Sequence, residues 1–235
     1  MNAPASVPVP APAPVSEGPA LRIVVADDER MVRTALRVIL DAEPDLEVVG
    51  EAATGAEAVS VVRELRPDVV LMDVRMPEID GIQATRQILS GPDGPRIVVV
   101  TTFENDAYVY DALRVGAAGF LLKRAAPEEL VSAVRLVARS DSLLYPAAVR
   151  GLAAEHARRH PPAPPAWAAR LTEREADVLR HMAKGLTNAE IAGLLGVGPA
   201  TVKTHVAAVL SKTGARDRTQ AVILAYESGF VRPST

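Results

Sequence analysis

The stretch Ile23-Val24-Val25-Ala26-Asp27-Asp28 places two carboxylates directly after a short apolar run. Three further apolar runs follow along the chain, and each of them ends in one polar residue, in the order Asp73, Thr101 and Lys123. Short apolar runs that are separated by helical patterns predict buried parallel strands of an α/β sheet. Because ligands bind at the carboxyl ends of such strands, we expect three carboxylates, a hydroxyl and an amine at one edge of the sheet.

Composition narrows the class of protein. The chain has 235 residues, enough for one large domain or two small ones, and it has no cysteine, which excludes disulfides and thiolate metal sites. No apolar run approaches the roughly 20 residues that a membrane span requires. Residues 1–20 lack the basic start and the uninterrupted apolar core of a signal peptide. We therefore expect a cytoplasmic protein.

Proline-rich segments divide the chain. Residues 1–20 form an expected disordered Pro/Ala-rich arm, and residues 141–167 form an expected linker that is Pro-rich at 158–166. Between them, residues 21–140 carry 14 basic and 20 acidic side chains, whereas residues 141–235 carry 12 basic and 8 acidic ones. The basic excess of the second part agrees with a nucleic-acid partner, but it also occurs on ordinary solvated surfaces.

In residues 21–140, five strands alternate with five helices. A capping box of Thr54 and Glu57 opens the second helix, and the other helices are expected near residues 30–40, 82–89, 105–115 and 127–138. Right-handed crossovers then give a three-layer (βα)5 domain. Residues 168–235 contain no strand pattern and predict an all-α domain of four short helices. Its signals are three capping boxes and three glycines that end helices: Thr172/Glu175, Thr187/Glu190, Asp217/Gln220, Gly185, Gly196 and Gly214.

The polar edge of the sheet fits a metal-assisted phosphoryl acceptor, with Asp73 as the nucleophile that becomes an aspartyl phosphate. Three crowded carboxylates repel one another, and oxygen ligands favour Mg²⁺ as the cation that relieves this repulsion. Asp28 and Asp73 are the expected direct ligands, and Asp27 binds directly or through water. Lys123 and Thr101 are expected to contact phosphoryl oxygens. Each residue alone is more often a helix cap, a turn residue or a solvated charge; the four strand ends together favour the acceptor.

Residues 21–140 resemble the receiver domain of two-component response regulators, with matching segments at 25–29, 72–81, 100–103 and 116–123. The resemblance implies a flavodoxin-like fold with a parallel 2-1-3-4-5 sheet. It also implies that a histidine kinase phosphorylates Asp73, that the backbone carbonyl of Arg75 binds Mg²⁺, and that Thr101 and Phe120 form the switch pair. Phe120 stands where many receivers have tyrosine, so an aromatic hydroxyl is absent. Arg124 stands where Asp or Pro is frequent.

The second domain has helix-turn-helix proportions, with a helix at 188–195, a turn at 196–199 and a second helix at about 200–212. The second helix is expected to enter the major groove with its outward face. This face consists of Thr204, Ala207, Ala208 and Ser211, with Lys203 on one flank. We assign His205, Lys212, Arg216 and Arg218 to phosphate contacts or to structure. Geometry alone fits a four-helix protein-binding module equally well. Residues 168–232 resemble a LuxR-type DNA-binding domain, which implies double-stranded promoter DNA as the partner.

Together the two resemblances identify the chain as similar to NarL/FixJ-type response regulators, which implies a phosphorylation-gated transcription factor that forms a homodimer on phosphorylation. The rival reading is an enzyme, a phosphatase or a dinucleotide-dependent one. No G-x-G-x-x-G follows the first strand, and the acidic turn there would repel a pyrophosphate. A third reading is a receiver that has lost phosphorylation, which the complete acidic trio and Lys123 argue against. We therefore expect a regulator and not an enzyme.

Overall fold

The computed structural model describes residues 19–91, 94–102, 106–139, 143–144, 146–159 and 165–231. Of the arm expected over residues 1–20, only residues 19 and 20 are described. Residues 160–164 of the proline-rich linker also lie outside the described part of the chain.

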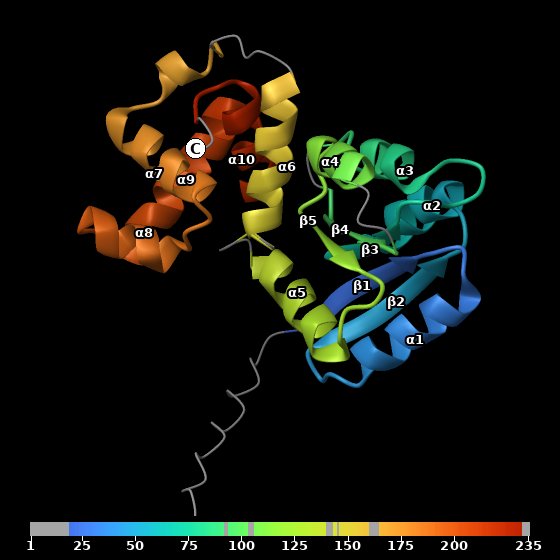
Figure 1. Ribbon diagram of the computed structural model, residues 1–235. Helices are drawn as coiled ribbons and strands as arrows, with labels where there is room; N and C mark the ends of the chain where they lie inside the picture. The colour runs from blue at the N-terminus through green and yellow to red at the C-terminus, as the bar shows by residue number, and fades with distance from the viewer. Residues whose placement is uncertain are drawn as a thin grey trace, which may run out of the picture.

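The first domain contains a five-stranded parallel sheet in the order β2-β1-β3-β4-β5, which confirms the predicted topology (Figure 1). β3 pairs with β1 on one side and with β4 on the other, so that Asp73 at the end of β3 lies at the centre of the sheet edge. The strands are β1 Leu21–Ala26, β2 Leu46–Ala52, β3 Val69–Asp73, β4 Arg96–Thr101 and β5 Gly119–Leu122.

Helices cover both faces of this sheet, as the alternating pattern predicts. Apolar residues of α1 and α5 pack on one face, and those of α2 and α3 pack on the other. Thr54 caps α2 through a bond from the Glu57 amide, but the Glu57 carboxylate accepts from the Ala53 amide instead of the Thr54 amide. The helices are α1 Arg30–Asp41, α2 Gly55–Leu65, α3 Gly81–Ile88, α4 Asp106–Arg114 and α5 Pro127–Arg139.

The second domain contains the four predicted helices, preceded by a short 3₁₀ turn at Ala168–Arg170. Thr172 and Thr187 form complete capping boxes, while at Asp217 only the side-chain bond to the Gln220 amide is present. Gly196 and Gly214 end their helices in the left-handed conformation, as expected. The helices are α7 Glu173–Ala183, α8 Asn188–Leu195, α9 Pro199–Thr213 and α10 Arg218–Glu227.

A further helix, α6 Pro146–Arg159, occupies part of the segment that we expected to be a linker. Its alanine-rich sequence favours helix, and proline is well tolerated at the first helical position. The proline cluster at its far end drew the sequence interpretation towards an extended linker. Val149 and Ala153 of α6 are fully buried in the core that surrounds α10.

The two domains are in contact along α4, α6 and α10, which lie side by side in Figure 1. One apolar cluster continues from Leu113 of α4 to Ile223 of α10. At the opposite end of the sheet from Asp73, Thr219 Oγ1 donates to the carbonyl of Ala118 at 2.6 Å, and Arg216 Nη1 donates to the carbonyl of Leu89 at 2.7 Å. Among the described residues, no single helix is long and apolar enough to cross a bilayer.

Candidate functional site

The structure brings the three predicted carboxylates together at the carboxyl edge of the sheet. One oxygen from each of Asp27, Asp28 and Asp73 lies within 4.8 Å of the other two. Asp27 and Asp73 are buried, whereas Asp28 is exposed. This arrangement follows from the parallel order, because β1 and β3 are neighbours and end at the same level.

Lys123, which follows β5, reaches across the edge to the same carboxylates. Its Nζ lies 2.7 Å from Asp27 Oδ2, 3.0 Å from Asp73 Oδ2 and 3.5 Å from Glu29 Oε1. Burial opposes the charged amine, but its ion pair with Asp27 and its hydrogen bond to Asp73 outweigh this and raise the pKa of Lys123. Lys123 is therefore a fixed positive charge beside Asp73.

Burial also acts on Asp73, and here it raises the pKa of the carboxyl group, while the bond from Lys123 opposes that rise. Carboxylates that are crowded together and partly removed from water repel one another, and a divalent cation between them relieves this repulsion. Asp27 Oδ2 is buried and accepts no hydrogen bond of good geometry among the described residues, although the Lys123 amine is near. The oxygen-only donor set therefore fits a hard cation such as Mg²⁺.

Glycine makes the close approach of α3 to this edge possible. A Cβ atom on Gly81 would lie 1.8 Å from the backbone oxygen of Asp73. Gly81 N donates to the Val74 carbonyl at 2.9 Å, and Asp80 caps α3 through a bond from the Gln83 amide at 2.7 Å. Gly81 lies in the stretch that resembles receivers, but its steric role became visible only in the structure.

The two residues of the expected switch pair lie on neighbouring strands. Thr101 is the last residue of β4 and is buried, and Phe120 is the second residue of β5 and half-buried. Phe120 packs against the apolar cluster that continues into the helical domain. Arg75, expected to offer its carbonyl to the metal, is exposed, and its amide bonds to the Asp73 carboxylate.

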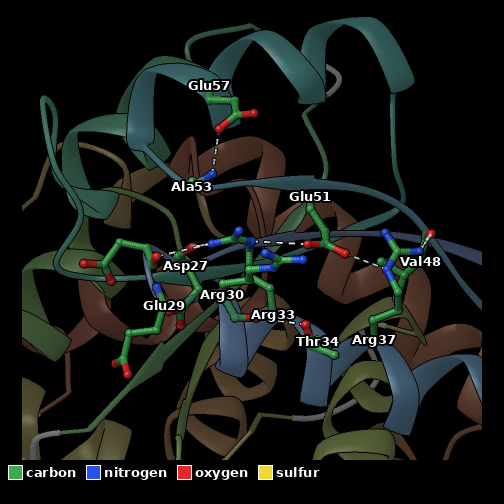
Figure 2. A network of polar contacts seen from close by, with 11 residues as sticks. Asp27, Glu29, Arg30, Arg33, Thr34, Arg37, Val48, Glu51, Ala53 and Glu57 are labelled. Carbon is green, nitrogen blue, oxygen red and sulfur yellow. Dashed lines mark hydrogen bonds and ion pairs between the residues drawn. The ribbon is translucent and has the colours of Figure 1, made fainter.

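A polar network lies behind the acidic loop, between α1 and β2 (Figure 2). Arg33 donates from Nη1 to the backbone oxygen of Asp27 at 2.7 Å and from Nε to Glu51 at 3.2 Å. Arg37 donates to the other oxygen of Glu51 at 2.6 Å. The sequence patterns did not reveal this network. The available signal was an arginine one helical turn after three consecutive acidic residues.

In the helical domain, α9 buries Val202, Val206 and Val209 against its neighbours. Most of the side chains that we expected to face DNA lie on the opposite side of α9 and are exposed, namely Lys203, Thr204, Ala207 and Ser211, while His205 and Ala208 are half-buried. Small residues along this face permit close approach to a groove of DNA.

Two basic residues of the expected DNA-contacting set have partners inside the helical domain. Lys212 Nζ lies 2.6 Å from Glu175 Oε2, and Arg218 is buried with Nη1 donating to Asn188 Oδ1 at 2.9 Å. Arg218 also donates to the backbone oxygen of Leu186. These contacts support the structural part of the assignment "phosphate contacts or structure". Arg216, assigned in the same way, donates to the carbonyls of Leu89 and Gly91 in the first domain.

Comparison with known proteins agrees with both halves of this geometry. Residues 23–135 match the response regulator receiver domain, and residues 169–225 match the bacterial regulatory proteins of the luxR family. The chain belongs to the LuxR-type response regulators. This family consists of transcription regulators and not of enzymes, and a receiver domain implies a kinase partner.

Individual relatives cover almost the whole protein. The chain is 40% identical to the transcriptional regulatory protein YxjL of Bacillus subtilis over 90% of this chain and 98% of that protein. It is 39% identical to the transcriptional regulatory protein LiaR of the same organism over 90% of this chain and 99% of LiaR. Among solved structures, the receiver domain of the response regulator NarL from Mycobacterium tuberculosis is 38% identical, covers 52% of this chain and 98% of that chain, and has a TM-score of 0.51.

Proposed function

We propose that Asp73 of this response regulator accepts a phosphoryl group from the phosphohistidine of its kinase. The observation that carries the proposal is the position of Asp73, a buried carboxylate 3.0 Å from the Lys123 amine and within 4.8 Å of the Asp27 and Asp28 oxygens. A carboxylate oxygen of Asp73 attacks phosphorus, the new P–O bond forms, and the P–N bond to the imidazole breaks. Positioning and charge neutralisation supply most of the catalysis in such transfers.

Mg²⁺ is the cation we assign to this reaction, where it would neutralise charge on the carboxylates and on the phosphoryl oxygens. Asp27, Asp28, Asp73 and the backbone carbonyl of Arg75 would hold it. Lys123 pairs with one phosphoryl oxygen, and the Thr101 hydroxyl donates to another. Movement of Thr101 towards the phosphoryl group leaves space that Phe120 fills, a discrete repacking of side chains.

The output of the switch is binding to promoter DNA by α9. We propose that the residues of α9 that contact bases or phosphates are Lys203, Thr204, His205, Ala207, Ala208 and Ser211. We also propose that the protein acts in the cytoplasm and binds DNA as a homodimer. Lys212 and Arg218 belong to this surface only in a secondary role, since both have internal partners. The domain boundaries that we propose are 21–140 for the receiver domain and 168–235 for the DNA-binding domain. The connecting segment, 141–167, contains α6.

Labelling with radioactive acetyl phosphate tests the acceptor. The wild type with Mg²⁺ should take up at most one phosphoryl group per chain, and Asp73→Asn should take up none. Lys203→Ala serves as the matched control, because it should be labelled normally and yet bind genomic promoter fragments more weakly. Labelling that persists in Asp73→Asn would overturn the acceptor assignment.

A further inference from the structure

Arg33 in α1 makes contacts that the proposed chemistry does not use. Its guanidinium turns back towards the loop that precedes the helix, and Nη1 lies 2.7 Å from the backbone oxygen of Asp27 and 3.3 Å from that of Asp28. Only 14% of the side chain is exposed, although it is charged and lies on a surface helix. Burying a cation is costly unless hydrogen bonds or ion pairs offset the cost. The guanidinium therefore stays in the one position where it makes these bonds.

Glu51 on β2 fixes the orientation of this guanidinium (Figure 2). It accepts from Arg33 Nε at 3.2 Å on one oxygen and from Arg37 Nε at 2.6 Å on the other. The hydrogen bond from Arg37 is the main reason why the pKa of Glu51 is lowered, although burial opposes it. Arg37 is in turn tied to β2 through the Val48 carbonyl at 2.9 Å.

The two carbonyls that Arg33 contacts belong to the peptide units on either side of Asp28. Fixing these units fixes the direction of the Cα–Cβ bond of Asp28. It also fixes the Glu29 amide, which donates to Asp27 Oδ1 at 2.9 Å and so orients that carboxylate. The Asp27 amide is bonded to the Ala52 carbonyl at 3.0 Å, so the loop is tied to β2 from two directions.

We infer that Arg33 is a positioning residue for the metal site, since it holds the backbone of the Asp27–Asp28 loop so that both carboxylates face the cation. The inference rests on the proposed binding of Mg²⁺ by these residues. It assigns Arg33 no contact with the metal or with the phosphoryl group. Groups that orient metal ligands in this way typically change metal affinity by about 10- to 100-fold.

A role of Arg33 through its charge and a role through positioning the loop predict opposite effects of Arg33→Met on the Mg²⁺ affinity. A cation near a Mg²⁺ site repels the ion, so if Arg33 acted through its charge alone, Arg33→Met would bind Mg²⁺ more tightly. The same reasoning predicts no change for Arg33→Lys. If Arg33 positions the loop, both variants bind Mg²⁺ more weakly, because lysine cannot reproduce the fork that joins Glu51 to the loop carbonyls.

The experiment is a calorimetric Mg²⁺ titration of the full chain, followed by acetyl phosphate labelling at low and at saturating Mg²⁺. We expect the Mg²⁺ affinity of Arg33→Met to fall about 10-fold, with Arg33→Lys falling in the same direction. Saturating Mg²⁺ should restore the labelling of both variants. Arg37→Met is the matched control, because it loses the same charge one turn further along α1 and, among the described residues, has no hydrogen bond or ion pair to the acidic loop. It acts on the loop only through Glu51, which Arg33 also holds, so its Mg²⁺ affinity should fall clearly less than that of Arg33→Met.

Unchanged or tighter Mg²⁺ binding by Arg33→Lys and Arg33→Met would overturn the inference, as would an equal loss in Arg37→Met. Thermal unfolding without Mg²⁺ shows whether Arg33→Met still folds; if it does not, the charge-conserving Arg33→Lys decides the question alone. A wild type that neither binds Mg²⁺ nor becomes labelled would instead refute the proposed function, and this inference with it.

Discussion

Tyr110 on α4 donates its hydroxyl proton to the carboxylate of Glu227, the last residue of α10, and this bond joins the receiver domain to the helical domain. Arg114 Nε lies 3.5 Å from the same carboxylate. Burial, together with the bond to Glu227, raises the pKa of Tyr110 far above its ordinary value, so the hydroxyl remains a donor at neutral pH. The domain contact therefore includes a charge-assisted hydrogen bond on the helix next to β5.

Tyr110→Phe should loosen this contact. The substitution removes a bond to a charged group, which contributes about 1.5–3 kcal/mol, and leaves the apolar packing of the ring in place. We expect faster amide hydrogen exchange in α4 and α10, with little change in the strands. Tyr108→Phe is the control, because Tyr108 lies on the same helix and is exposed. Equal exchange rates in α10 for the two variants would show that the bond to Glu227 does not hold the domains together.

Gly81→Ala should displace the backbone at Asp73 and so disturb the acidic site. Its Cβ atom would lie 1.8 Å from the Asp73 carbonyl oxygen, a backbone atom that cannot rotate away, whereas the only side-chain atom among the three nearest, Met72 Cγ, lies at 3.1 Å. We expect destabilisation of about 1–3 kcal/mol or more, together with slower labelling of Asp73.

Thermal unfolding and acetyl phosphate labelling measure the two effects of Gly81→Ala. The control is Gly193→Ala in α8, where an added Cβ has no atom within 4 Å. Alanine there should stabilise the helix by up to about 1 kcal/mol. Normal stability and normal labelling of Gly81→Ala would contradict the steric role that we assign to this glycine.

Substitutions of Lys203 and Arg218 should distinguish a residue that contacts DNA from one that stabilises the fold. Lys203→Ala should lower promoter affinity and, if the amine contacts a phosphate, reduce the slope of log K against log salt by about one, while thermal stability stays unchanged. Arg218→Ala should lower the thermal stability of the helical domain, because Asn188 and the Leu186 carbonyl lose a buried donor. Fluorescence anisotropy at several salt concentrations, together with thermal unfolding, tests both; a stable Arg218→Ala with the salt slope of Lys203→Ala would reverse the assignment.

The candidate site could be predicted from sequence because its residues follow strand ends. In a parallel sheet, strand order and strand ends determine which residues meet, so Asp27, Asp73 and Lys123 could be placed together from the sequence. The helix ends could also be predicted, because their signals are local: Thr172, Gly196 and Gly214 act on the backbone within four residues.

The other parts of the site depend on contacts that leave no periodic signal. Arg33 bonds to backbone carbonyls, which every residue possesses, so no pairing of residue types reveals it. Arg218 was a candidate for DNA phosphates because a sequence does not show which arginine is buried. The partners of Tyr110 and Thr219 lie more than 100 positions away along the chain, and only the docking of the two domains creates these bonds.

Glu175 gives a prediction with a defined pH dependence. Its carboxylate bonds to Lys212 and closes the capping box of α7, and the bond from Lys212 is the main reason why its pKa lies below the ordinary value of 4.5. A group whose pKa is lowered by folding adds stability above its unfolded pKa and loses this contribution as the pH falls through the folded value. Glu175→Gln keeps a capping acceptor but loses the ion pair, so it should be less stable at pH 7 by up to about 1 kcal/mol.

The gap between the wild type and Glu175→Gln should therefore be constant at neutral pH, shrink below pH 4.5 and vanish once Glu175 is protonated in the folded state. Urea unfolding followed by the fluorescence of Trp167 measures it, because this is the only tryptophan of the chain and lies at the start of the helical domain, 5.3 Å from the Phe230 ring between centroids. Glu173→Gln, an exposed acidic residue in the same helical turn, should show a smaller gap. A stability difference between the wild type and Glu175→Gln that stays the same well below pH 4.5 would mean that the shape of the Glu175 side chain, and not its charge, stabilises α7.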